Sequence, residues 1–309
     1  MKPIATLTLN PALDVTTEVD KVEANRKLRC APERRDPGGG GINVARAVTL
    51  LGGEAVALYP RGGETGHNLE SLLADQGVPQ RAVPVAGAVR EDFTVRETAS
   101  GASYRFVLPG PELSQQEWQA CLDALEDLEP RPDYLVASGS LPRGVPEDIY
   151  ARVADRAREL GIRLILDSSG QSLRAALERG LFLVRTNLRE FQELLGTETD
   201  SDDQLEQRAR QFVAQGGAEV VVVTLKDRGA LLAAREGSWR VTAPKVEVVS
   251  PSGAGDCFVA ALTLALARGE DYPTALGQGM AGASAAMLTP GTELLRREDM
   301  ERLVQEMAE

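Results

Sequence analysis

The sequence predicts an α/β protein built on a doubly wound parallel sheet that helices cover on both faces. Short runs rich in valine, isoleucine and leucine alternate with segments of helical apolar spacing along most of the chain. Some of these runs contain a continuous apolar stretch, such as the four valines at 220–223, which is typical of parallel strands buried on both faces. Alternation of this kind predicts strands that lie parallel with helices as crossovers.

The elements follow one another in a regular order. Strands are predicted at 4–10, 54–60, 133–139, 162–169, 181–187 and 219–225. Helices are predicted at 41–53, 65–77, 146–161, 172–180, 189–196, 201–217, 257–269 and 273–288. Residues 229–243 read as a strand, a turn and a strand at the other end of the sheet.

Two segments interrupt this order. Residues 14–35 have weak strand character and no helix, and residues 92–108 read as two strands joined at Ala99, Ser100 and Gly101. Two such antiparallel insertions in a parallel sheet are compatible with a small flap beside a cleft or with an ordinary decorated edge of the sheet.

Composition limits the classes of partner. The 309 residues suffice for one large α/β domain or two smaller ones, and the net charge of -12 argues against nucleic acid or an anionic membrane as a partner. Three widely spaced cysteines without a CxxC pattern indicate a reducing, cytoplasmic setting. The amino terminus lacks the apolar stretch of a signal peptide, and no window is apolar enough for a membrane span.

Histidine chemistry is also restricted. His67 is the only histidine, which excludes zinc sites of the HExxH type, and it lies in an expected helix start where we expect it to be solvated.

Four consecutive glycines at 38–41 precede the helix expected at 41–53. Glycine lets a ligand approach the backbone, and a helix start offers unpaired N–H groups to an anion. Gly39 and Gly40 are therefore candidate substrate-binding residues, and Asn43 in the first turn could donate to a hydroxyl group. A tight turn alone would not require four glycines.

The stretch "GQGMAG" at 277–282 imitates a dinucleotide fingerprint. That motif needs a strand before it and a helix that opens at it. Here its flanks form one continuous helical pattern, so we interpret its small residues as a surface that approaches a neighbouring helix or a flat ligand. No GxxxxGK[ST] motif exists either, which excludes a P-loop.

The stretch "SPSGAGDCF" at 250–258 combines small residues with an acid at a helix start. The N–H groups of Gly253, Ala254 and Gly255 would form an anion hole, and Asp256 would face the same point. Phosphoryl transfer needs this pairing of donors for the moving group with a carboxylate that accepts a hydroxyl proton. A role in the helix dipole alone would not explain the glycines.

A second polar pair is Asn187 and Glu190. Their spacing predicts neighbours on one helix face, and their oxygen atoms suit magnesium and its bound waters.

These motifs together resemble the ribokinase-like sugar kinases of the PfkB group. "GGGGINVAR" is similar to the first signature of that family and "SPSGAGDCFVAAL" to the second, and the likeness extends from Thr6 to the carboxyl terminus. The resemblance implies a single three-layer α/β/α kinase domain over 1–309, with a β lid formed by insertions at about 14–35 and 90–108. It also implies ATP and Mg²⁺ as cofactors and a homodimer that forms through the lid.

The resemblance assigns roles to individual residues. Asp256 would be the catalytic base; Asp14, Gly39, Asn43 and Ser140 would contact the sugar; Arg90 and Arg105 would bind its phosphate; and Lys27 on the lid would reach the site of a neighbouring subunit. Asn187 and Glu190 would organise Mg²⁺, while the nucleotide would lie against Arg185, Thr224, Lys226, Gly229 and the helix around Gly279 and Ala283. Ser250, Ser252, Ala286, Thr289, Gly291 and Glu293 stand where some relatives bind K⁺.

Three stretches depart from the family pattern. Arg185-Thr186-Asn187 replaces the usual Lys-Pro-Asn, which keeps the charge but changes reach and geometry. Lys226 stands where glycine is usual before the nucleotide turn, so it could touch a phosphate or obstruct one. Pro251 and Ser252 replace the usual Thr and Val beside the expected K⁺ position.

Stretches such as "TLTLNPALD" and "SGSLPRGV" are most similar to the hexose-phosphate branch of the family. The likeness implies ATP-dependent phosphorylation of fructose 6-phosphate at its 1-hydroxyl. Tagatose-6-phosphate kinase and 1-phosphofructokinase activities remain alternatives, as does a sugar-phosphate sensor without catalysis.

Overall fold

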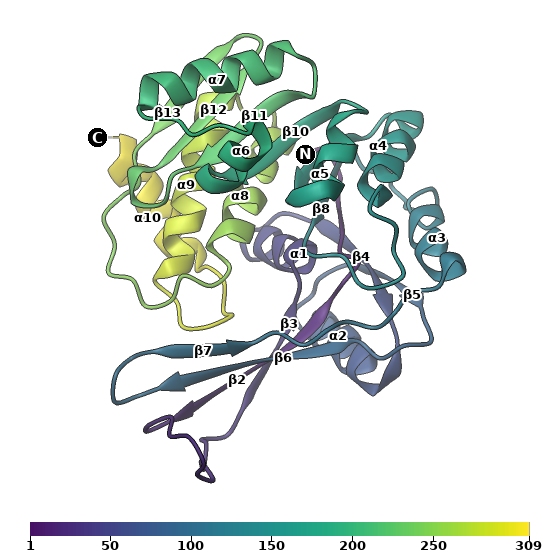
Figure 1. Ribbon diagram of the computed structural model, residues 1–309, viewed down its shortest axis with the longest axis vertical. Helices are drawn as coiled ribbons and strands as arrows, with labels where there is room; N and C mark the ends of the chain where they lie inside the picture. Colours follow the sequence, from purple (N-terminus) through teal and green to yellow (C-terminus); the bar gives the residue numbers. More distant parts are fainter. Residues whose placement is uncertain (309) are drawn as a thin grey trace.

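A nine-stranded sheet forms the body of the protein in a computed structural model that describes residues 1–308 (Figure 1). The strand order is β13-β12-β11-β10-β9-β8-β1-β4-β5. The strands from β5 to β11 pair in parallel, and β12 and β13 add an antiparallel edge. The strands are β1 (Ile4–Leu7), β4 (Ala55–Arg61), β5 (Gln80–Pro84), β8 (Tyr134–Ser138), β9 (Arg163–Asp167), β10 (Leu181–Asn187), β11 (Ala218–Thr224), β12 (Ala230–Ala234) and β13 (Gly237–Val241).

Helices cover this sheet in two layers, which confirms the predicted architecture. One layer packs the first core cluster and contains α1 (Gly40–Leu50), α2 (Gly63–Asp75), α8 (Ala254–Arg268), α9 (Tyr272–Met287) and α10 (Arg297–Ala308). The other packs the second cluster and contains α3 (Gln115–Asp123), α4 (Ile149–Leu160), α5 (Gly170–Leu177), α6 (Leu188–Leu195) and α7 (Asp202–Ala214). None of the helices described within residues 1–308 has the length and apolar character that a bilayer-spanning segment requires.

Strand β11 shows why the buried strands are apolar throughout. Val220 and Val222 belong to the first core cluster, and Val221 and Val223 belong to the second. Successive side chains point to opposite faces of a strand, so a strand covered on both faces needs an apolar residue at every position.

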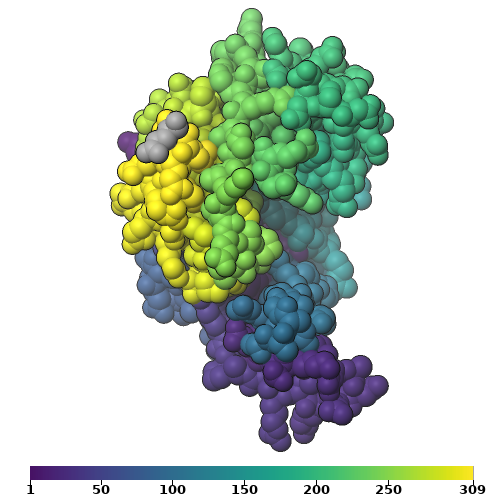
Figure 2. Space-filling model, turned by 90° about the vertical axis from the view of Figure 1, so that its left-hand side faces the viewer, coloured from purple at the N-terminus to yellow at the C-terminus, as the bar shows by residue number. Residues whose placement is uncertain are grey.

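The two interrupting segments belong to a separate four-stranded sheet with the order β3-β2-β6-β7. Its strands are β2 (Ala12–Val19), β3 (Arg34–Gly38), β6 (Arg90–Glu97) and β7 (Ser103–Phe106). We call these strands and their connections the lid, which projects from the body in Figures 1 and 2. The expectation of antiparallel insertions was incomplete, because the central pair β2–β6 is parallel and joins segments remote in sequence.

Three elements of the body were not predicted: β5, α3 and α10. Each buries few apolar side chains, such as Val83 in β5 and Met300 and Leu303 in α10. Their patterns are therefore too weak to stand out in the sequence.

The decoy stretch at 277–282 lies inside the uninterrupted helix α9, which confirms that it does not open a dinucleotide site. A Cβ atom at Gly282 would lie 2.8 Å from the Cβ atom of Ala261 in α8. The small residues thus let α9 pack closely against α8.

Candidate active site

A cavity of about 500 Å³ lies between the lid and the carboxyl ends of the central strands. This position is where open α/β sheets usually bind ligands. We call it the lid cavity; its walls are Gly39, Gly40 and Asn43, lid residues Arg90, Asp92 and Arg105, Ser138 to Leu141, Asp167 to Ser169, Ser172, Glu190 and Asp256.

Asp256 lies in the first turn of α8, and the side-chain amide of Asn43 donates to its Oδ2 atom at 2.9 Å. The helix starts at Gly253, which has a left-handed φ of 75° and leaves no room for a side chain beside Leu294. The first N–H groups of a helix have no intrahelical acceptor. The carboxylate and free backbone donors are therefore adjacent in the first turn of α8, and the carboxylate faces Asn43 of α1.

Burial raises the pKa of Asp256 to about 7. The hydrogen bond from Asn43 and the charge of Arg185 act in the opposite direction, because both favour the ionised form. The carboxylates of Asp167 and Asp14 add to the effect of burial. A carboxyl group that titrates near neutral pH is suited to accept and release a proton.

The glycine-rich turn is tightly packed against the body. Gly39 has a φ of 109°, which disfavours side chains, and a Cβ atom at Gly40 would collide with the Ser138 hydroxyl at the end of β8. The packing thus requires glycine at both positions and leaves the start of α1 open to the cavity.

Arg185 lies at the end of β10, against the start of α8. It donates to Asp167 at 3.2 Å and to the hydroxyl of Thr224 at 2.9 Å, and its Nη1 atom is 3.2 Å from where a Cβ of Gly255 would lie. Its Nε atom is buried and has no hydrogen-bond partner within residues 1–308. A buried donor without a partner at this place suits an anionic ligand.

A second cavity, of about 660 Å³, opens on the opposite side of Arg185. We call it the α8–α9 cavity; its walls include Arg185, Asn187, Thr224, Lys226, Asp227, Gly229, Lys245, Ala254, Gly255, Phe258, Met280, Ala283 and Met287. Five of the six residues expected at the nucleotide therefore come together, and Asn187, expected at Mg²⁺, lies with them. Gly279 does not line the cavity, because it faces Leu262 and Phe258 of α8.

Lys226 has a left-handed φ of 59°. Glycine adopts this conformation without strain, which explains why related sequences usually place glycine there. The lysine lines the α8–α9 cavity, so the strained backbone holds a positive charge at its wall.

Asn187 and Glu190 are neighbours, as their spacing predicted, but Asn187 caps the helix instead of lying on its face. Asn187 is the N-cap of α6, where its side chain accepts from the Glu190 N–H at 3.0 Å. Glu190 in turn accepts from the Asn187 N–H through Oε2 at 2.9 Å. This capping box leaves Oε1 of Glu190, at the lid cavity, without a hydrogen-bond partner among residues 1–308.

Residues 1–308 contain no group of three His, Cys, Asp or Glu side chains that could ligate a metal ion unaided. Mg²⁺ usually retains several waters and binds through one or two carboxylates together with phosphates. Glu190 and Asp167, which both line the lid cavity, fit that mode of binding.

The lid contributes two arginines with different surroundings. Arg90 is half-buried and paired with Asp92 at 2.9 Å, and its buried Nε atom has no partner within the described residues. Arg105 is exposed at the cavity wall. Asp14 is buried in β2 next to the cavity rather than in its wall, and burial raises its pKa to about 6.

The two remaining expected substrate residues differ in their relation to the cavity. The Ser140 hydroxyl accepts from the Asn10 amide at 3.0 Å and lies at the cavity wall. Lys27 is exposed on the connection between β2 and β3 and does not line the cavity of its own chain.

The residues expected at a K⁺ site lie in the loop before α8 and at the end of α9. The Ala286 carbonyl accepts from the Thr289 hydroxyl at 2.8 Å, and Glu293 pairs with Arg34 and Arg296. Ser250 accepts from the Ser252 N–H at 3.2 Å, and Gly291 has a left-handed φ of 58°. Ser250, Ser252 and Gly291 thus retain carbonyl groups for a cation, while Ala286 and Glu293 already have protein partners.

Sequence reasoning missed Asp167, Asp92 and Lys245. Asp167 ends the apolar strand β9, and carboxyl ends of parallel strands meet at one edge, so this signal was available. Asp92 and Lys245 follow no comparable pattern.

Comparisons with known proteins agree on one family. The model of the "pfkB family carbohydrate kinase" matches residues 8–298. The ATP-dependent 6-phosphofructokinase isozyme 2 of Mycobacterium tuberculosis is 47% identical over 306 residues, which are 99% of this chain and 90% of that protein.

Solved structures give the same result. Phosphofructokinase-2 from Escherichia coli superposes with a TM-score of 0.94 in complex with fructose-6-phosphate and 0.95 in complex with potassium. The sequence identities are 39% and 40%, and each comparison covers 100% of both chains. Arabidopsis thaliana ribokinase, 20% identical with a TM-score of 0.75 over 99% of both chains, shares the fold. The ribokinase-like fold class predicted from the sequence is confirmed.

The raised pKa of Asp256 predicts a cost in stability at neutral pH. The folded chain binds this proton more tightly than the unfolded chain, whose aspartate titrates near 3.8, so stability falls as pH rises between about 4 and 7. Asp256→Asn should therefore increase the free energy of unfolding at pH 8 by on the order of 4 kcal/mol, and by much less at pH 4. Urea unfolding at both pH values measures the difference.

Asp127→Asn is the control for that experiment, because Asp127 is exposed and far from the cavity walls. It should not change the pH dependence. An equal increase in the free energy of unfolding of Asp256→Asn at both pH values would contradict the raised pKa of Asp256.

Proposed function

Because the chain belongs to the pfkB family of carbohydrate kinases, we propose that it transfers the terminal phosphoryl group of ATP to the 1-hydroxyl of fructose 6-phosphate. The observation that carries this proposal is the position of Asp256. Its carboxylate lies in the lid cavity, while Gly255 and Arg185 at the same helix start line the α8–α9 cavity. The sugar that accepts the phosphoryl group and the ATP that donates it would thus meet at the start of α8.

In the proposed reaction the sugar hydroxyl lies beside Asp256. The carboxylate accepts the hydroxyl proton as the oxygen–phosphorus bond forms and the bond to the leaving ADP oxygen breaks. Asn43 holds the carboxylate through its hydrogen bond, and the pKa near 7 allows the proton to be released again after the transfer.

Charge on the moving phosphoryl group needs donors that are already in place. We assign this role to the backbone N–H groups at Gly253, Ala254 and Gly255 and to the guanidinium of Arg185. Arg185 is held from both sides by Asp167 and Thr224, so it does not need to be ordered when the ligands bind.

We assign the nucleotide to the α8–α9 cavity. Phe258, Met280 and Met287 offer an apolar surface for a base, and Lys226 and Lys245 offer positive charge for phosphates. Bound Mg²⁺ would neutralise the phosphate oxygens, with Glu190 and Asn187 orienting its waters. A K⁺ ion at the loop with Ser250 and Ser252 is part of the same proposal, as is a location in the cytoplasm, where ATP is available.

We assign the sugar phosphate to Arg105 and Arg90 of the lid. A guanidinium can hold a phosphate dianion through two parallel hydrogen bonds. Asp14, Gly39, Gly40, Asn43 and Ser140 would contact the sugar, and movement of the lid toward the body would exclude water from the transfer.

We further propose that two copies of the chain pair through the lid. Phe93, Tyr104, Phe106 and Val107 of the lid are between 37% and 59% exposed, and strand β7 is an unpaired edge. Exposed apolar edge strands are usually covered, here by a second copy. Lys27 could then reach the partner's cavity.

A phosphorylation screen tests the reaction. With ATP and Mg²⁺ the protein should phosphorylate fructose 6-phosphate faster than tagatose 6-phosphate, fructose 1-phosphate or fructose. Asp256→Asn should lower kcat by at least about a hundredfold, since general base catalysis contributes that much. Faster turnover of another phosphate would reassign the substrate, whereas calorimetric binding without turnover of any sugar would indicate a sensor.

The lid arginines should control affinity for the sugar phosphate. Arg105→Ala should raise the KM for fructose 6-phosphate about tenfold or more, because a charge-assisted contact is lost, and should leave the KM for ATP nearly unchanged. Arg96→Ala is the matched control, because Arg96 lies on the same lid sheet but outside the cavity wall. Equal KM values for Arg105→Ala and the unmodified enzyme would remove the phosphate assignment.

Sedimentation velocity at micromolar concentration tests the pairing. The unmodified protein should sediment as a dimer and Phe106→Glu as a monomer, since a charge in an apolar interface is costly. Leu50→Glu, at an exposed apolar residue outside the lid, should remain dimeric. A monomer for the unmodified chain would refute the lid interface.

A further inference from the structure

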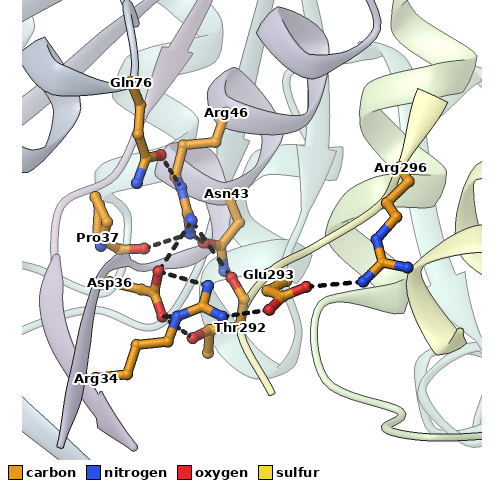
Figure 3. Close-up of polar contacts among 9 residues, drawn as sticks. All are labelled: Arg34, Asp36, Pro37, Asn43, Arg46, Gln76, Thr292, Glu293 and Arg296. Atoms are coloured by element: carbon orange, nitrogen blue, oxygen red, sulfur yellow. Dashed lines mark hydrogen bonds and ion pairs between the residues drawn. The ribbon is translucent and has the colours of Figure 1, made fainter. Parts of the chain in front are cut away.

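Arg46 is a charged residue in the middle of α1 that is only 4% exposed. The proposed reaction gives it no role, yet it lies one turn from Asn43, on the side away from the cavity. Figure 3 shows its guanidinium surrounded by groups from the lid, from the end of α2 and from the loop that follows α9.

The guanidinium makes a full set of contacts. Its Nε atom donates to the side chain of Gln76 at 2.7 Å, and Nη1 donates to the Pro37 carbonyl at 2.7 Å. Its Nη2 atom donates to the Thr292 carbonyl at 3.3 Å and lies 3.6 Å from the Asp36 carboxylate. These contacts fix the orientation of the group from three sides.

The same Nη1 atom also donates to Oδ1 of Asn43 at 3.3 Å. A guanidinium has five N–H donors and no acceptor, so only the oxygen of the Asn43 amide can face it. The amide nitrogen must then point the other way, toward Oδ2 of Asp256. With the amide reversed, two donors would face each other at Arg46 and two acceptors would face each other at Asp256.

We propose that Arg46 is a positioning residue that fixes the Asn43 amide with its NH₂ group on the carboxylate of Asp256. The proposal rests on the proposed role of Asp256 as the base. Arg46 itself touches neither reactant in this arrangement and acts only through Asn43.

The lid holds Arg46 in turn. Asp36 in β3 accepts from Arg34 at 2.9 Å and from the Thr292 hydroxyl at 2.6 Å, and Arg34 also pairs with Glu293 (Figure 3). The orientation of the base is therefore linked through Asn43 and Arg46 to a strand of the lid.

Several charged groups surround Asp256, and each would persist when Arg46 is changed. Asp14 from β2, Asp167 from β9 and Arg185 from β10 act on it through their charges, and Glu190 from α6 lines the same cavity. A further group that acts on Asp256 is the uncharged Asn43 amide from α1, which Arg46 contacts directly. A change at Arg46 should thus alter the hydrogen bond that favours the ionised carboxylate of Asp256. The charge of Arg46 also lowers the pKa of Asp14, so Arg46→Lys, which keeps the charge, isolates the effect of the hydrogen bond.

Arg46→Met tests the proposal through the pH profile of kcat/KM for fructose 6-phosphate. The acidic limb should move upward by about one pH unit, because a hydrogen bond to a charged group is worth roughly that much. Activity at pH 6 should fall correspondingly more than at pH 8. Arg46→Lys keeps the charge without the planar fork, and the limb should move in the same direction by less.

Gln76→Met is the matched control, because it removes another contact of Arg46 and leaves Asn43 untouched. It should lower the melting temperature without moving the limb. In an Asn43→Ser background, Arg46→Lys should cause no further shift, since the amide that it orients is gone.

The outcomes separate this inference from the proposed function. An acidic limb that stays in place in both Arg46 variants, while Asp256→Asn is inactive, would overturn the positioning role alone. Normal turnover by Asp256→Asn would instead overturn the base. If Arg46→Met does not fold, the pH profile of Arg46→Lys decides. An acidic limb that moves upward supports the positioning role, and one that stays in place overturns it.

Discussion

The hydrogen bond between Asn43 and Asp256 joins two helix starts that are 213 residues apart in the chain. Each helix begins after a glycine with a positive φ, Gly39 before α1 and Gly253 before α8. The start of α1 lines the lid cavity with Gly39 and Gly40, and the start of α8 lines the α8–α9 cavity with Ala254 and Gly255. The remaining site is built around this junction, since the lid closes over one helix start and the α8–α9 cavity opens beside the other.

Close helix packing keeps the junction in place. Gly282 in α9 leaves no gap to Ala261 and to the Cys257 carbonyl in α8. The small residues at 277–282, which match a dinucleotide fingerprint in sequence, thus allow close packing inside the protein. This packing holds α8, whose first turn carries the reactive carboxylate of Asp256. The same arrangement gives the acidic group a buried setting, in which its charge is unfavourable and its proton is exchanged near neutral pH.

Local patterns predicted the body of the fold well, because strand and helix periodicity depend on neighbours in sequence. The valines of β11 and the continuous helix α9 are examples. Long-range strand pairing was harder to predict from the sequence, because the parallel β2–β6 pair, which sets Asp14 opposite Asp92, has no local signature.

At the site, the glycine-rich stretches and Asp256 could be chosen from the sequence. The capping box of Asn187 and Glu190, the left-handed backbone at Lys226 and the inward packing of Gly279 depend on geometry that spacing alone does not give.

The pairing of Arg90 with Asp92 has a consequence for which molecules can occupy the lid. A ligand that takes the Nη1 donor of Arg90 competes with the buried carboxylate of Asp92, which already holds it at 2.9 Å, whereas the Nε donor is free within the described residues. A dianionic group attracts the guanidinium more strongly than a singly charged one, and a neutral sugar cannot compete through charge at all. The lid would therefore select ligands by their charge as well as by their hydroxyl groups. Uncharged sugars would bind poorly and would not be phosphorylated at the expense of ATP.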